Sequence, residues 1–300
     1  MIVTDKLYNG GKCIAALGTF DGVHIGHCAV IKKAMNFGLP VIVVTSKQNP
    51  RQVLVGNNGR ILSDALCDEA FEKLGVQGIV RLDFEDIRNM TAVEYLDMLC
   101  QKASAVGFAS GFNFRFGKGA SGNADTLVEY AAEKGFKCSI CDSVDIDGGP
   151  VSSTRIREAL SHGDIAIANK LLGRPYAINF EVAHGDARGR EMGFPTINQP
   201  FGDSYALPRF GVYASVVEVS GKKYPAVTNV GVKPTFSNDK VIAETHICGY
   251  TGDIYGESPV VELITFIRPE AKFESVKALV SQIEKDKQTA VEIIEKTDCF

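Results

Sequence analysis

Apolar runs and amphipathic stretches alternate along the first part of the chain. The runs expected to form buried strands are residues 13–17, 40–45, 78–82, 105–109 and 137–141. Between them, apolar residues recur at the three- and four-residue spacing of a helix with one buried face. Strands that alternate with such helices are typical of a mostly parallel sheet covered on both faces. The pattern therefore predicts an α/β domain.

Capping residues locate several helix ends in this region. Thr91 and Glu94 have the spacing of a capping box, and Ser63 precedes the apolar stripe of another helix. Asp164 is expected to begin a helix that stops at Gly173, because glycine is favoured just beyond a helix end. We place a domain boundary there. It divides the chain into residues 1–172 and residues 173–300.

A different pattern follows residue 176. Strand-like runs occur at residues 177–183, 212–219, 223–229, 241–248 and 259–267, separated by Gly, Pro and Asn. This spacing is typical of an antiparallel barrel or sandwich. Residues 275–295 carry apolar positions at helical spacing, so we expect one long helix packed against the barrel.

The composition indicates a globular chain with more than one core. It has 300 residues, of which 45% are hydrophobic and 23% charged, and this length favours about two domains. A net charge of −4 gives no general attraction for nucleic acid, whose phosphates bind Lys and Arg clusters. We therefore expect small-molecule ligands and no nucleic-acid partner, with any phosphate bound locally.

The sequence has no pattern expected of a secreted or membrane protein. Its longest apolar stretch, residues 39–44, is too short to span a bilayer, and residues 1–20 do not resemble a signal peptide. We expect a cytoplasmic protein whose eight cysteines are scattered thiols. Cys138 and Cys141 form a lone C-x-x-C, for which a redox or metal role is the less favoured interpretation.

The most informative motif is G-T-F-D-G-V-H-I-G-H at residues 18–27. It joins a predicted strand to a predicted helix, where glycines let the backbone approach a ligand and the helix start favours an anion. His24 and His27 are three residues apart and share one face of that helix. Imidazole donors aimed at phosphate oxygens would stabilise the charge that develops when a phosphoanhydride breaks. A His-x-x-His metal site is less favoured, because no third ligand lies close in sequence.

A second phosphate-binding pattern, S-S-T-R-I-R, occupies residues 152–157. Hydroxyl groups, a helix start and two guanidinium groups would converge there. For this segment alone, a serine-capped helix with surface arginines is the simpler interpretation. Together with the histidine motif, the segment favours a nucleotide clamp.

Two glycine-flanked segments are ambiguous. Residues 111–117 alternate aromatic and polar groups, which is common in a core, although the flanking glycines favour a loop wall near a ligand. Residues 117–122 match the G-x-G-x-x-G fingerprint of dinucleotide sites, with Asp142 farther on. That fingerprint should open the first strand-turn-helix of its unit, where the histidine motif already lies. A dinucleotide site is therefore not expected.

The second domain has its own candidate site. A loop rich in Gly and Arg at residues 185–190 precedes G-F-P-T-I-N at residues 193–198. Backbone N–H groups, a hydroxyl and an amide oxygen of these segments can hold phosphates and a magnesium ion. Farther on, Glu244 and His246 flank Thr245 in a predicted strand and so face the same way. Glu244 is either a solubilising residue on an edge strand or a general base.

The motifs together resemble those of bacterial bifunctional riboflavin kinase/FAD synthetase over nearly the whole chain. The resemblance rests on G-T-F-D-G-V-H-I-G-H at 18–27, N-F-R-F-G at 113–117, S-S-T-R-I-R at 152–157, L-G-R-P-Y at 172–176, G-F-P-T-I-N at 193–198, N-V-G-V-K-P-T-F at 229–236 and E-T-H at 244–246. It implies a Rossmann-like nucleotidyltransferase domain that adenylylates FMN. It also implies a six-stranded antiparallel β-barrel with a C-terminal helix, which phosphorylates riboflavin.

The resemblance implies roles for residues of the first domain. The FMN phosphate would attack the α-phosphorus of MgATP and release pyrophosphate, while His24 and His27 stabilise the developing charge. Asn113 and Phe116 would bind the flavin. The other ATP-binding residues would be Gly18, Thr19, Phe20, Asp21, Ser153, Thr154, Arg155 and Arg157.

In the second domain, the resemblance makes Glu244 the base that accepts the proton of the riboflavin 5′-hydroxyl. Thr196 and Asn198 would hold the nucleotide and Mg²⁺. Further contacts to ATP would come from Gly185, Arg188 and Gly189. Mg²⁺ would be the cofactor, with ATP, riboflavin, FMN and FAD as substrates or products, and we expect a monomer or weak oligomer.

Three positions depart from the family pattern. T-S-K-Q-N-P at residues 45–50 replaces an aromatic residue and a Pro-His-Pro element, which affects the flavin side of the adenylylation site. Asn179 and Phe180 replace a glycine, and Ile197 replaces an alanine. Neither of these last two changes touches an assigned reactive group.

Two other functions stay open at this point. A monofunctional enzyme would keep one module as a flavin-binding scaffold, and a protein acting on nucleic acid would use a similar nucleotidyltransferase domain beside a small barrel. Every assigned reactive side chain is present in both modules, which favours two activities. The acidic balance argues against nucleic acid.

Overall fold

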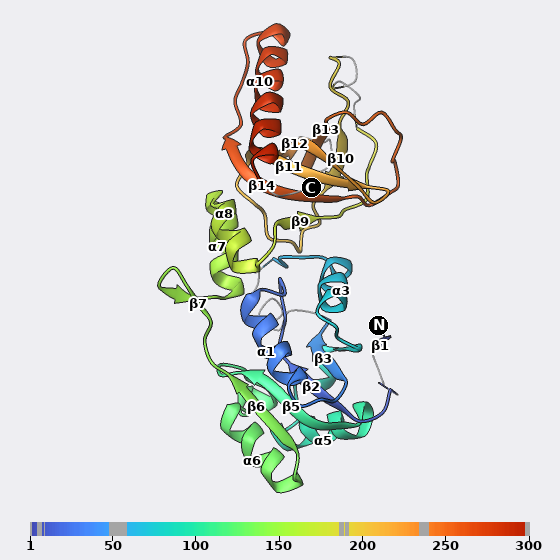
Figure 1. Cartoon of the computed structure of the whole chain (residues 1–300), viewed down its shortest axis with the longest axis vertical. Helices are drawn as coiled ribbons and strands as arrows, with labels where there is room; N and C mark the ends of the chain where they lie inside the picture. The colour runs from blue at the N-terminus through green and yellow to red at the C-terminus, as the bar shows by residue number, and fades with distance from the viewer. Residues whose placement is uncertain are drawn as a thin grey trace. The chain divides into compact units, whose positions relative to one another are not determined.

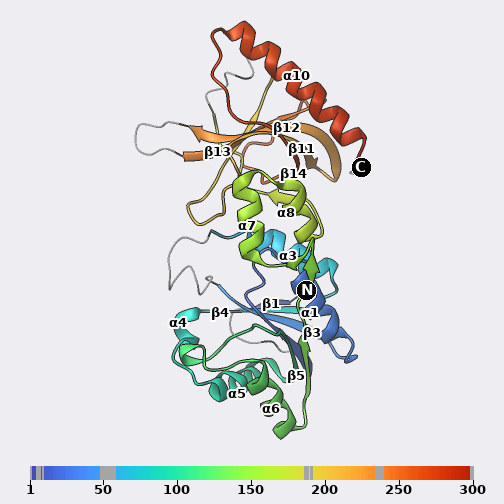
Figure 2. The same cartoon turned by 90° about the vertical axis from the view of Figure 1, so that its left-hand side faces the viewer.

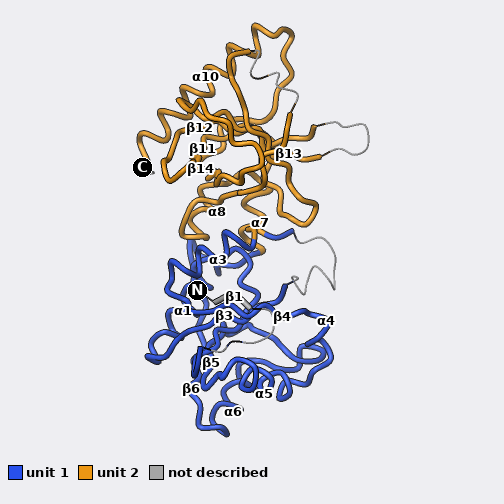
Figure 3. The backbone as a smooth tube through the Cα atoms, turned by 90° about the vertical axis from the view of Figure 1, so that its right-hand side faces the viewer, with its two compact units in different colours: residues 1–60, 64–153 blue, residues 61–63, 154–300 orange. Residues whose placement is uncertain are grey.

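A computed structural model of the chain describes residues 2–4, 8, 10–47, 59–185, 189, 192–233 and 240–297. The internal contacts divide the chain into two compact units (Figure 3). Unit 1 comprises residues 1–60 and 64–153, and unit 2 comprises residues 61–63 and 154–300. No helix among the described residues is both long and apolar enough to cross a membrane.

Unit 1 is built on a six-stranded sheet whose neighbouring strands are all parallel, in the order β1-β4-β3-β2-β5-β6. Figure 1 labels five of these strands, all but β4. The strands are β1 (Ile2–Thr4), β2 (Cys13–Leu17), β3 (Val41–Ser46), β4 (Gly78–Leu82), β5 (Ala105–Gly111) and β6 (Lys137–Cys141). The chain adds β3 and β4 on one side of β2 and then crosses to add β5 on the other. Ligands of open parallel sheets bind at such a reversal, outside the carboxyl ends of the strands.

Helices cover both faces of this sheet, as the alternating pattern predicts. The helices are α1 (Ile25–Met35), α3 (Asp64–Lys73), α4 (Phe84–Ile87), α5 (Ala92–Ala103) and α6 (Ala124–Lys134), with a 3₁₀ turn at Lys118–Ala120. Side chains of α5 and α6 share one core with Cys13, Ala15 and Leu17 of β2. Since side chains alternate along a strand, the other residues of β2 face the opposite side, where α1 and α3 lie (Figure 2). The capping box predicted at Thr91 and Glu94 is present.

Unit 2 contains a six-stranded antiparallel sheet in the order β10-β13-β12-β11-β14-β9. Its strands are β9 (Tyr176–Ile178), β10 (Ile197–Pro200), β11 (Gly211–Val219), β12 (Lys222–Lys233), β13 (Lys240–Ile247) and β14 (Val260–Arg268). Although β9 and β10 are at opposite edges, Ala183, which follows β9, pairs with Asn198 of β10 through an N–H···O bond of 2.8 Å. This pairing curls the sheet into the predicted barrel.

The last helix, α10 (Val276–Glu295), covers the outer face of this sheet. Ala290 and Ile294 of α10 share a core with Val212 and Ala214 of β11. The helix is also tied to the end of β14, because the guanidinium of Arg268 donates to both carboxylate oxygens of Asp286, with Nε–Oδ1 at 3.0 Å and Nη2–Oδ2 at 2.7 Å. The long tail helix predicted from apolar spacing is confirmed.

Two short helices, α7 (Ser153–His162) and α8 (Ile165–Leu172), precede the barrel. Asn169 of α8 donates through Nδ2 to the carbonyl of Leu263 at 3.0 Å and accepts from the backbone N–H of Tyr176 at 2.7 Å. These bonds join α8 to β14 and β9. The contacts therefore divide the chain after residue 153, whereas Gly173 does end α8 as predicted. The division of domains at 172/173 stays a prediction.

One strand prediction in unit 2 is wrong, and one strand was not predicted. The strand expected over residues 177–183 ends at Ile178, because the chain then crosses toward β10, where Gln199 Nε2 donates to the carbonyl of Phe180 at 2.6 Å. Strand β10 lies at residues for which the sequence predicted no strand. Its four residues follow a Gly-Phe-Pro turn, and only the pairing with β13 makes them a strand. A short hairpin, β7 (Asp145–Ile146) with β8 (Gly149–Pro150), was also not predicted.

Candidate functional site

The histidine motif of unit 1 forms the turn between β2 and the start of α1. His24 is the N-cap residue of α1, and its Nδ1 accepts the backbone N–H of His27 at 3.3 Å. The two imidazole rings stack, with centroids 3.5 Å apart and an interplanar angle of 14°. The prediction that both histidines share one face is confirmed. Because Nδ1 of His24 is an acceptor here, the ring carries its donor hydrogen on Nε2.

The backbone of this turn adopts conformations that side chains other than glycine rarely take. Phe20 has φ of 50° and Val23, which is β-branched, has φ of 41°. Both side chains are buried, so packing holds the turn in this shape. Such backbone outliers cluster at functional sites, because the surrounding structure must hold them there. A Cβ on Gly26 would lie 3.2 Å from the His24 ring, which explains the glycine at that position.

Ser153 contacts the histidine turn directly. Its hydroxyl donates to the carbonyl of Asp21 at 2.8 Å, so the last residue of unit 1 is held at this turn. Thr154, Arg155 and Arg157 follow in the first turns of α7 and belong to unit 2. Their contacts with a nucleotide stay a prediction.

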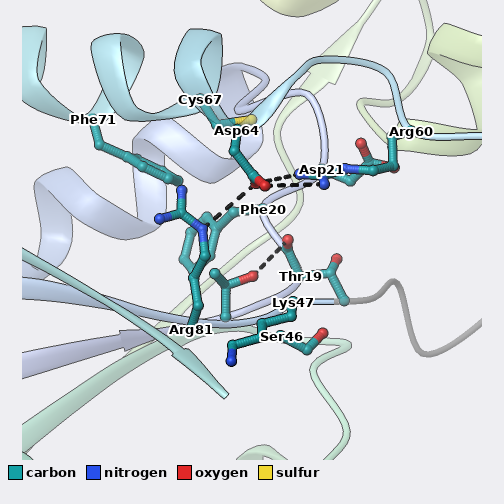
Figure 4. A pocket seen from close by; sticks show the side chains of 11 residues that line it. Thr19, Phe20, Asp21, Ser46, Lys47, Arg60, Asp64, Cys67, Phe71 and Arg81 are labelled. Carbon is teal, nitrogen blue, oxygen red and sulfur yellow. Dashed lines mark hydrogen bonds and ion pairs between the residues drawn. The ribbon is translucent and has the colours of Figure 1, made fainter. Parts of the chain in front are cut away.

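A pocket of about 470 Å³, including space open to solvent, lies beside the histidine turn within unit 1 (Figure 4). Its walls are the turn, the carboxyl ends of β3 and β4, and α3. Thr45 and Arg81 are in register on β3 and β4, and the Thr45 hydroxyl donates to the carbonyl of Thr19 at 2.9 Å. These bonds fix the base of the pocket at the ends of three adjacent strands.

Arg81 and Arg60 form an ion-pair cluster with two aspartates of α3. Arg81 contacts Asp68 and, through Nε, Asp64 at 3.5 Å, while Arg60 Nη1 donates to Asp64 at 3.2 Å. Burial by itself would raise the pKa of the Asp64 carboxyl. The hydrogen bond to Arg60 and the charges of both arginines outweigh burial, so the pKa is held below its usual value.

The predicted flavin-binding residues follow β5, at the same edge of the sheet. Asn113 is exposed in the loop after the strand, as the flanking glycines indicate. The Phe116 ring is buried, stacks on Phe114 with centroids 5.6 Å apart and lies 5.5 Å from the Tyr95 ring. Phe116 is therefore part of the core of unit 1, and its contact with a flavin stays a prediction.

The C-x-x-C pair lies in β6 as two free thiols. Burial raises the pKa of the Cys138 thiol to about 11 and also raises the pKa of Cys141. Thiol redox chemistry needs a thiolate, which a lowered pKa provides. The surroundings of these cysteines therefore do not favour the redox interpretation.

The candidate site of unit 2 is set by the register of three strands. Asn198 of β10 is directly opposite Glu244 of β13, which is directly opposite Asn229 of β12. Residues opposite each other in antiparallel strands have Cβ atoms about 4.5–5.5 Å apart on one face. An amide, a carboxylate and a second amide therefore lie in a row. Because β13 is between β10 and β12, Glu244 is not on an edge strand, and the solubilising interpretation is wrong.

The glycines of the 185–190 loop lie against the predicted nucleotide residues. A Cβ on Gly185 would come within 2.5 Å of Nδ2 of Asn198, and one on Gly189 would lie 3.4 Å from Oγ1 of Thr196. The backbone N–H of Phe194 donates to the carbonyl of Gly189 at 2.8 Å. The loop can lie this close because it lacks side chains at those points. Arg188 lies outside the described residues.

Two residues that the sequence analysis did not assign complete this face. Nδ1 of His246 lies 2.9 Å from the carbonyl oxygen of Pro195, which fastens the segment bearing Thr196 to β13. Glu270, which follows β14, accepts from Nδ2 of Asn229 at 3.4 Å. No sequence spacing connects Asn229, Glu244 and Glu270, so only pairing brings them together.

The oxygen donors of this face fit a magnesium ion. Thr196 offers a hydroxyl, Asn198 an amide oxygen and Glu244 a carboxylate, which are the hard ligands that Mg²⁺ prefers. Within the described ranges, no group of three or more His, Cys, Asp and Glu side chains is arranged to hold a metal. The donors present suit an ion that arrives with nucleotide phosphates.

Comparisons with known proteins cover nearly the whole chain. Residues 8–155 match the family model described as FAD synthetase, and residues 172–294 match that of riboflavin kinase. Two similar proteins are bifunctional riboflavin kinase/FMN adenylyltransferases. The one from Listeria monocytogenes serovar 1/2a is 34% identical over 96% of this chain and 94% of its own. The one from Bacillus subtilis is 35% identical over 93% of this chain and 92% of its own.

A solved structure is similar over the same length. It is described as a macrolide-efflux protein from Streptococcus pneumoniae and has a TM-score of 0.86 and 31% identity, covering 97% of this chain and 98% of its own. The histidine turn falls within the first matched family range, and the Asn198-Glu244-Asn229 row falls within the second. Residues 156–171, which include most of α7 and α8, lie between the two ranges.

Proposed function

The chain belongs to the family of bifunctional riboflavin kinases/FMN adenylyltransferases, and from this premise we propose which of its residues carry out each step. The enzyme phosphorylates riboflavin to FMN with ATP and then adenylylates FMN to FAD, releasing pyrophosphate. We assign the adenylylation to the histidine turn of unit 1 and the phosphorylation to the Asn198-Glu244-Asn229 row of unit 2.

In unit 1, a phosphate oxygen of FMN attacks the α-phosphorus of ATP. One P–O bond forms, the bond from the α-phosphorus to the bridging oxygen breaks, and pyrophosphate leaves with the electron pair. The Nε2 donor of His24 and the stacked ring of His27 lie at the helix start, where an anion is favoured. Their role is to stabilise the charge on the leaving pyrophosphate, without forming a covalent intermediate.

The remaining unit 1 residues bind the substrates in this proposal. Phe20 and Gly18 shape the turn, since a Cβ on Gly18 would lie 3.1 Å from the Phe20 ring. Ser153 is held at the turn by its bond to Asp21. Asn113, at the end of β5, contacts the flavin. Further contacts to ATP come from Thr19, Thr154, Arg155 and Arg157, and Phe116 supports the flavin loop.

In unit 2, Glu244 accepts the proton of the riboflavin 5′-hydroxyl as that oxygen attacks the γ-phosphorus of ATP. Thr196 and Asn198 hold Mg²⁺ with the nucleotide, and the loop with Gly185, Arg188 and Gly189 binds its phosphates. When bound, Mg²⁺ neutralises charge on the transferring phosphate oxygens. The row of side chains places the base next to the metal-binding amide, so most of the acceleration comes from positioning and charge neutralisation.

The observation that carries the proposal is the register that places Glu244 between two amides on an internal strand. The test is a time course of the full chain with riboflavin and MgATP, separating FMN and FAD by chromatography. We expect FMN to appear first and FAD to follow. Formation of FMN alone, or no use of riboflavin but FAD formation from FMN, would support a monofunctional enzyme instead.

Both activities are expected to need a divalent cation, and Mg²⁺ is the one proposed. The proposed ligands, a hydroxyl and an amide oxygen, suit an ion that is bound together with the phosphates of ATP. Chelation should abolish both steps, and added MgCl₂ should restore them. Full turnover after exhaustive chelation would contradict this.

We also propose a cytoplasmic enzyme, monomeric or weakly oligomeric, whose partners are these small molecules and not nucleic acid.

A further inference from the structure

Glu270 lies at the end of the Asn198-Glu244-Asn229 row of unit 2 and has no role among the residues assigned so far. Its Oε1 accepts a hydrogen bond from Nδ2 of Asn229 at 3.4 Å. A Cβ on Gly231 would collide with the same Oε1, so the carboxylate lies directly against the backbone of β12 at that glycine. Two contacts with β12 therefore place this carboxylate beside the row.

The segment that carries Glu270 is fixed by its neighbours. Arg268, the last residue of β14, is paired through its guanidinium with the buried Asp286 of α10, and its Nη1 donates to the carbonyl of Pro269 at 3.0 Å. Pro269 passes the start of β11 at Gly211, where an added Cβ would lie 3.0 Å from Cα of Pro269. The chain can therefore cross β11 closely and bring Glu270 to β12.

The bond to Glu270 determines the orientation of the Asn229 amide. A carboxylate accepts hydrogen bonds and cannot donate them, so the atom of Asn229 that faces Glu270 is the amide nitrogen. The amide oxygen points elsewhere, and it has no hydrogen-bond partner among the residues that the structure describes. Asn229 is partly exposed. Its Oδ1 is therefore an acceptor that a ligand can reach.

The register places this acceptor next to the proposed base. Asn229 of β12 is directly opposite Glu244 of β13, and opposite residues have Cβ atoms about 4.5–5.5 Å apart. Riboflavin carries hydroxyl groups on neighbouring carbons of a chain that ends in the 5′-hydroxyl. When the 5′-hydroxyl is at Glu244, another hydroxyl of that chain comes within reach of Asn229. Such a hydroxyl can donate to Oδ1.

We propose that Glu270 is a positioning residue for riboflavin. It holds the amide of Asn229 so that Oδ1 accepts a hydrogen bond from a hydroxyl of the polyol chain beside the attacking one. This rests on the phosphorylation proposed for unit 2. Glu270 itself contacts neither substrate, and Glu244 still takes the proton of the 5′-hydroxyl. Glu270 therefore determines affinity for riboflavin and not for ATP.

The experiment measures FMN formation from riboflavin and MgATP by the full chain, with kcat and with KM for each substrate. For Glu270→Ala we expect the KM for riboflavin to rise about fivefold, the effect of losing one neutral hydrogen bond. The KM for ATP should stay within about twofold. Glu270→Gln keeps an oxygen that can accept from Asn229 and should restore the KM for riboflavin. Glu274→Ala is the matched control, because Glu274 is an exposed glutamate of the same segment.

A double-mutant cycle tests whether Glu270 acts through Asn229. Asn229→Ala should raise the KM for riboflavin as much as Glu270→Ala does, and the double variant should raise it no further, because both residues serve one hydrogen bond. Effects that multiply in the double variant would overturn the inference. An unchanged KM for riboflavin in Glu270→Ala, or an equal rise in the KM for ATP, would also overturn it.

Partial unfolding gives a different result, because a smaller folded fraction lowers kcat and leaves both KM values unchanged. A fall in kcat alone in Glu270→Ala would therefore assign Glu270 a structural role and overturn the inference. If the wild-type chain makes no FMN from riboflavin, the proposed function of unit 2 fails instead. The two failures are therefore distinguishable.

Discussion

The two units build their reactive sites in opposite ways. In unit 1, the histidines come from one continuous turn at the carboxyl end of a parallel sheet, and strained backbone at Phe20 and Val23 shapes that turn. In unit 2, the reactive groups lie on the face of an antiparallel sheet, one from each of three strands. One site depends on local conformation and the other on register.

This difference has consequences for what can disturb each site. A one-residue slip in a strand moves a side chain to the opposite face of the sheet. In unit 2 that slip would exchange Glu244 for Thr245, whose hydroxyl is buried in a hydrogen-bonded row with Thr228 and Ser215. The buried hydroxyls therefore lock the register that aligns the reactive groups. The turn of unit 1 does not depend on strand register. It is constrained by its backbone, because few residues can adopt the positive φ angles found at Phe20 and Val23.

The largest expected effect is on the stability of unit 2, when the chain is cut at residue 172/173 and not at residue 153/154. A fragment of residues 173–300 lacks α8, whose buried Ile165, Leu171 and Leu172 pack in unit 2. Their burial contributes about 1.5–3 kcal/mol each, so we expect about 5 kcal/mol less unfolding free energy than in a fragment of residues 154–300. The two fragments are compared by their urea unfolding midpoints and by their riboflavin kinase activity. Equal midpoints would support the boundary at 172/173.

Next in size is removal of the proposed base. Glu244→Ala should lower FMN formation from riboflavin by about a thousandfold, because general-base catalysis contributes 10²–10⁴-fold. FAD formation from supplied FMN should not change. Glu244→Gln, which keeps the shape but cannot accept the proton, should lose as much. Retention of riboflavin phosphorylation in either variant would show that the row in unit 2 is structural, and loss of both steps would contradict two separate sites.

A smaller effect is expected in unit 1. His24→Ala should slow FAD formation about a hundredfold, the typical cost of losing one preorganised donor, and FMN should accumulate. Since His24 is also the N-cap of α1, its loss destabilises the helix by about 1 kcal/mol. His24→Asn restores a capping oxygen without the Nε2 donor. We expect Asn to recover the unfolding midpoint but not the rate, and recovery of both would assign His24 a structural role only.

The smallest effect concerns acid stability of unit 1. The pKa of Asp64 is lowered from its ordinary 3.8 in the folded chain, so the ionised form favours folding. That contribution is complete above the unfolded pKa and is lost as pH falls through the folded one. Unfolding midpoints measured from pH 5 to pH 3 should therefore fall less steeply for Asp64→Asn than for the wild type. Asp142→Asn, at an exposed position, is the control, and identical slopes for all three would contradict the role of the Arg60-Arg81 cluster.

Much of unit 1 could be predicted from the sequence because its signals are local. Strands 13–17, 78–82 and 137–141 have the predicted bounds, and the cap at Thr91 is present. The shared face of His24 and His27 follows from a three-residue spacing on a helix. These features depend on residues within a few positions of each other, so periodicity and capping rules are sufficient.

The sequence by itself thus determined the order of the two modules and the histidine turn, and it identified Glu244 as a candidate general base. Tertiary structure alone decided that β13 is internal, that Asn229 and Glu270 join Glu244, and that α8 packs in unit 2. It also decided that residues 197–200 form a strand. The physical reason is the range of the interactions, because pairing between strands distant in sequence selects neighbours that no local spacing encodes.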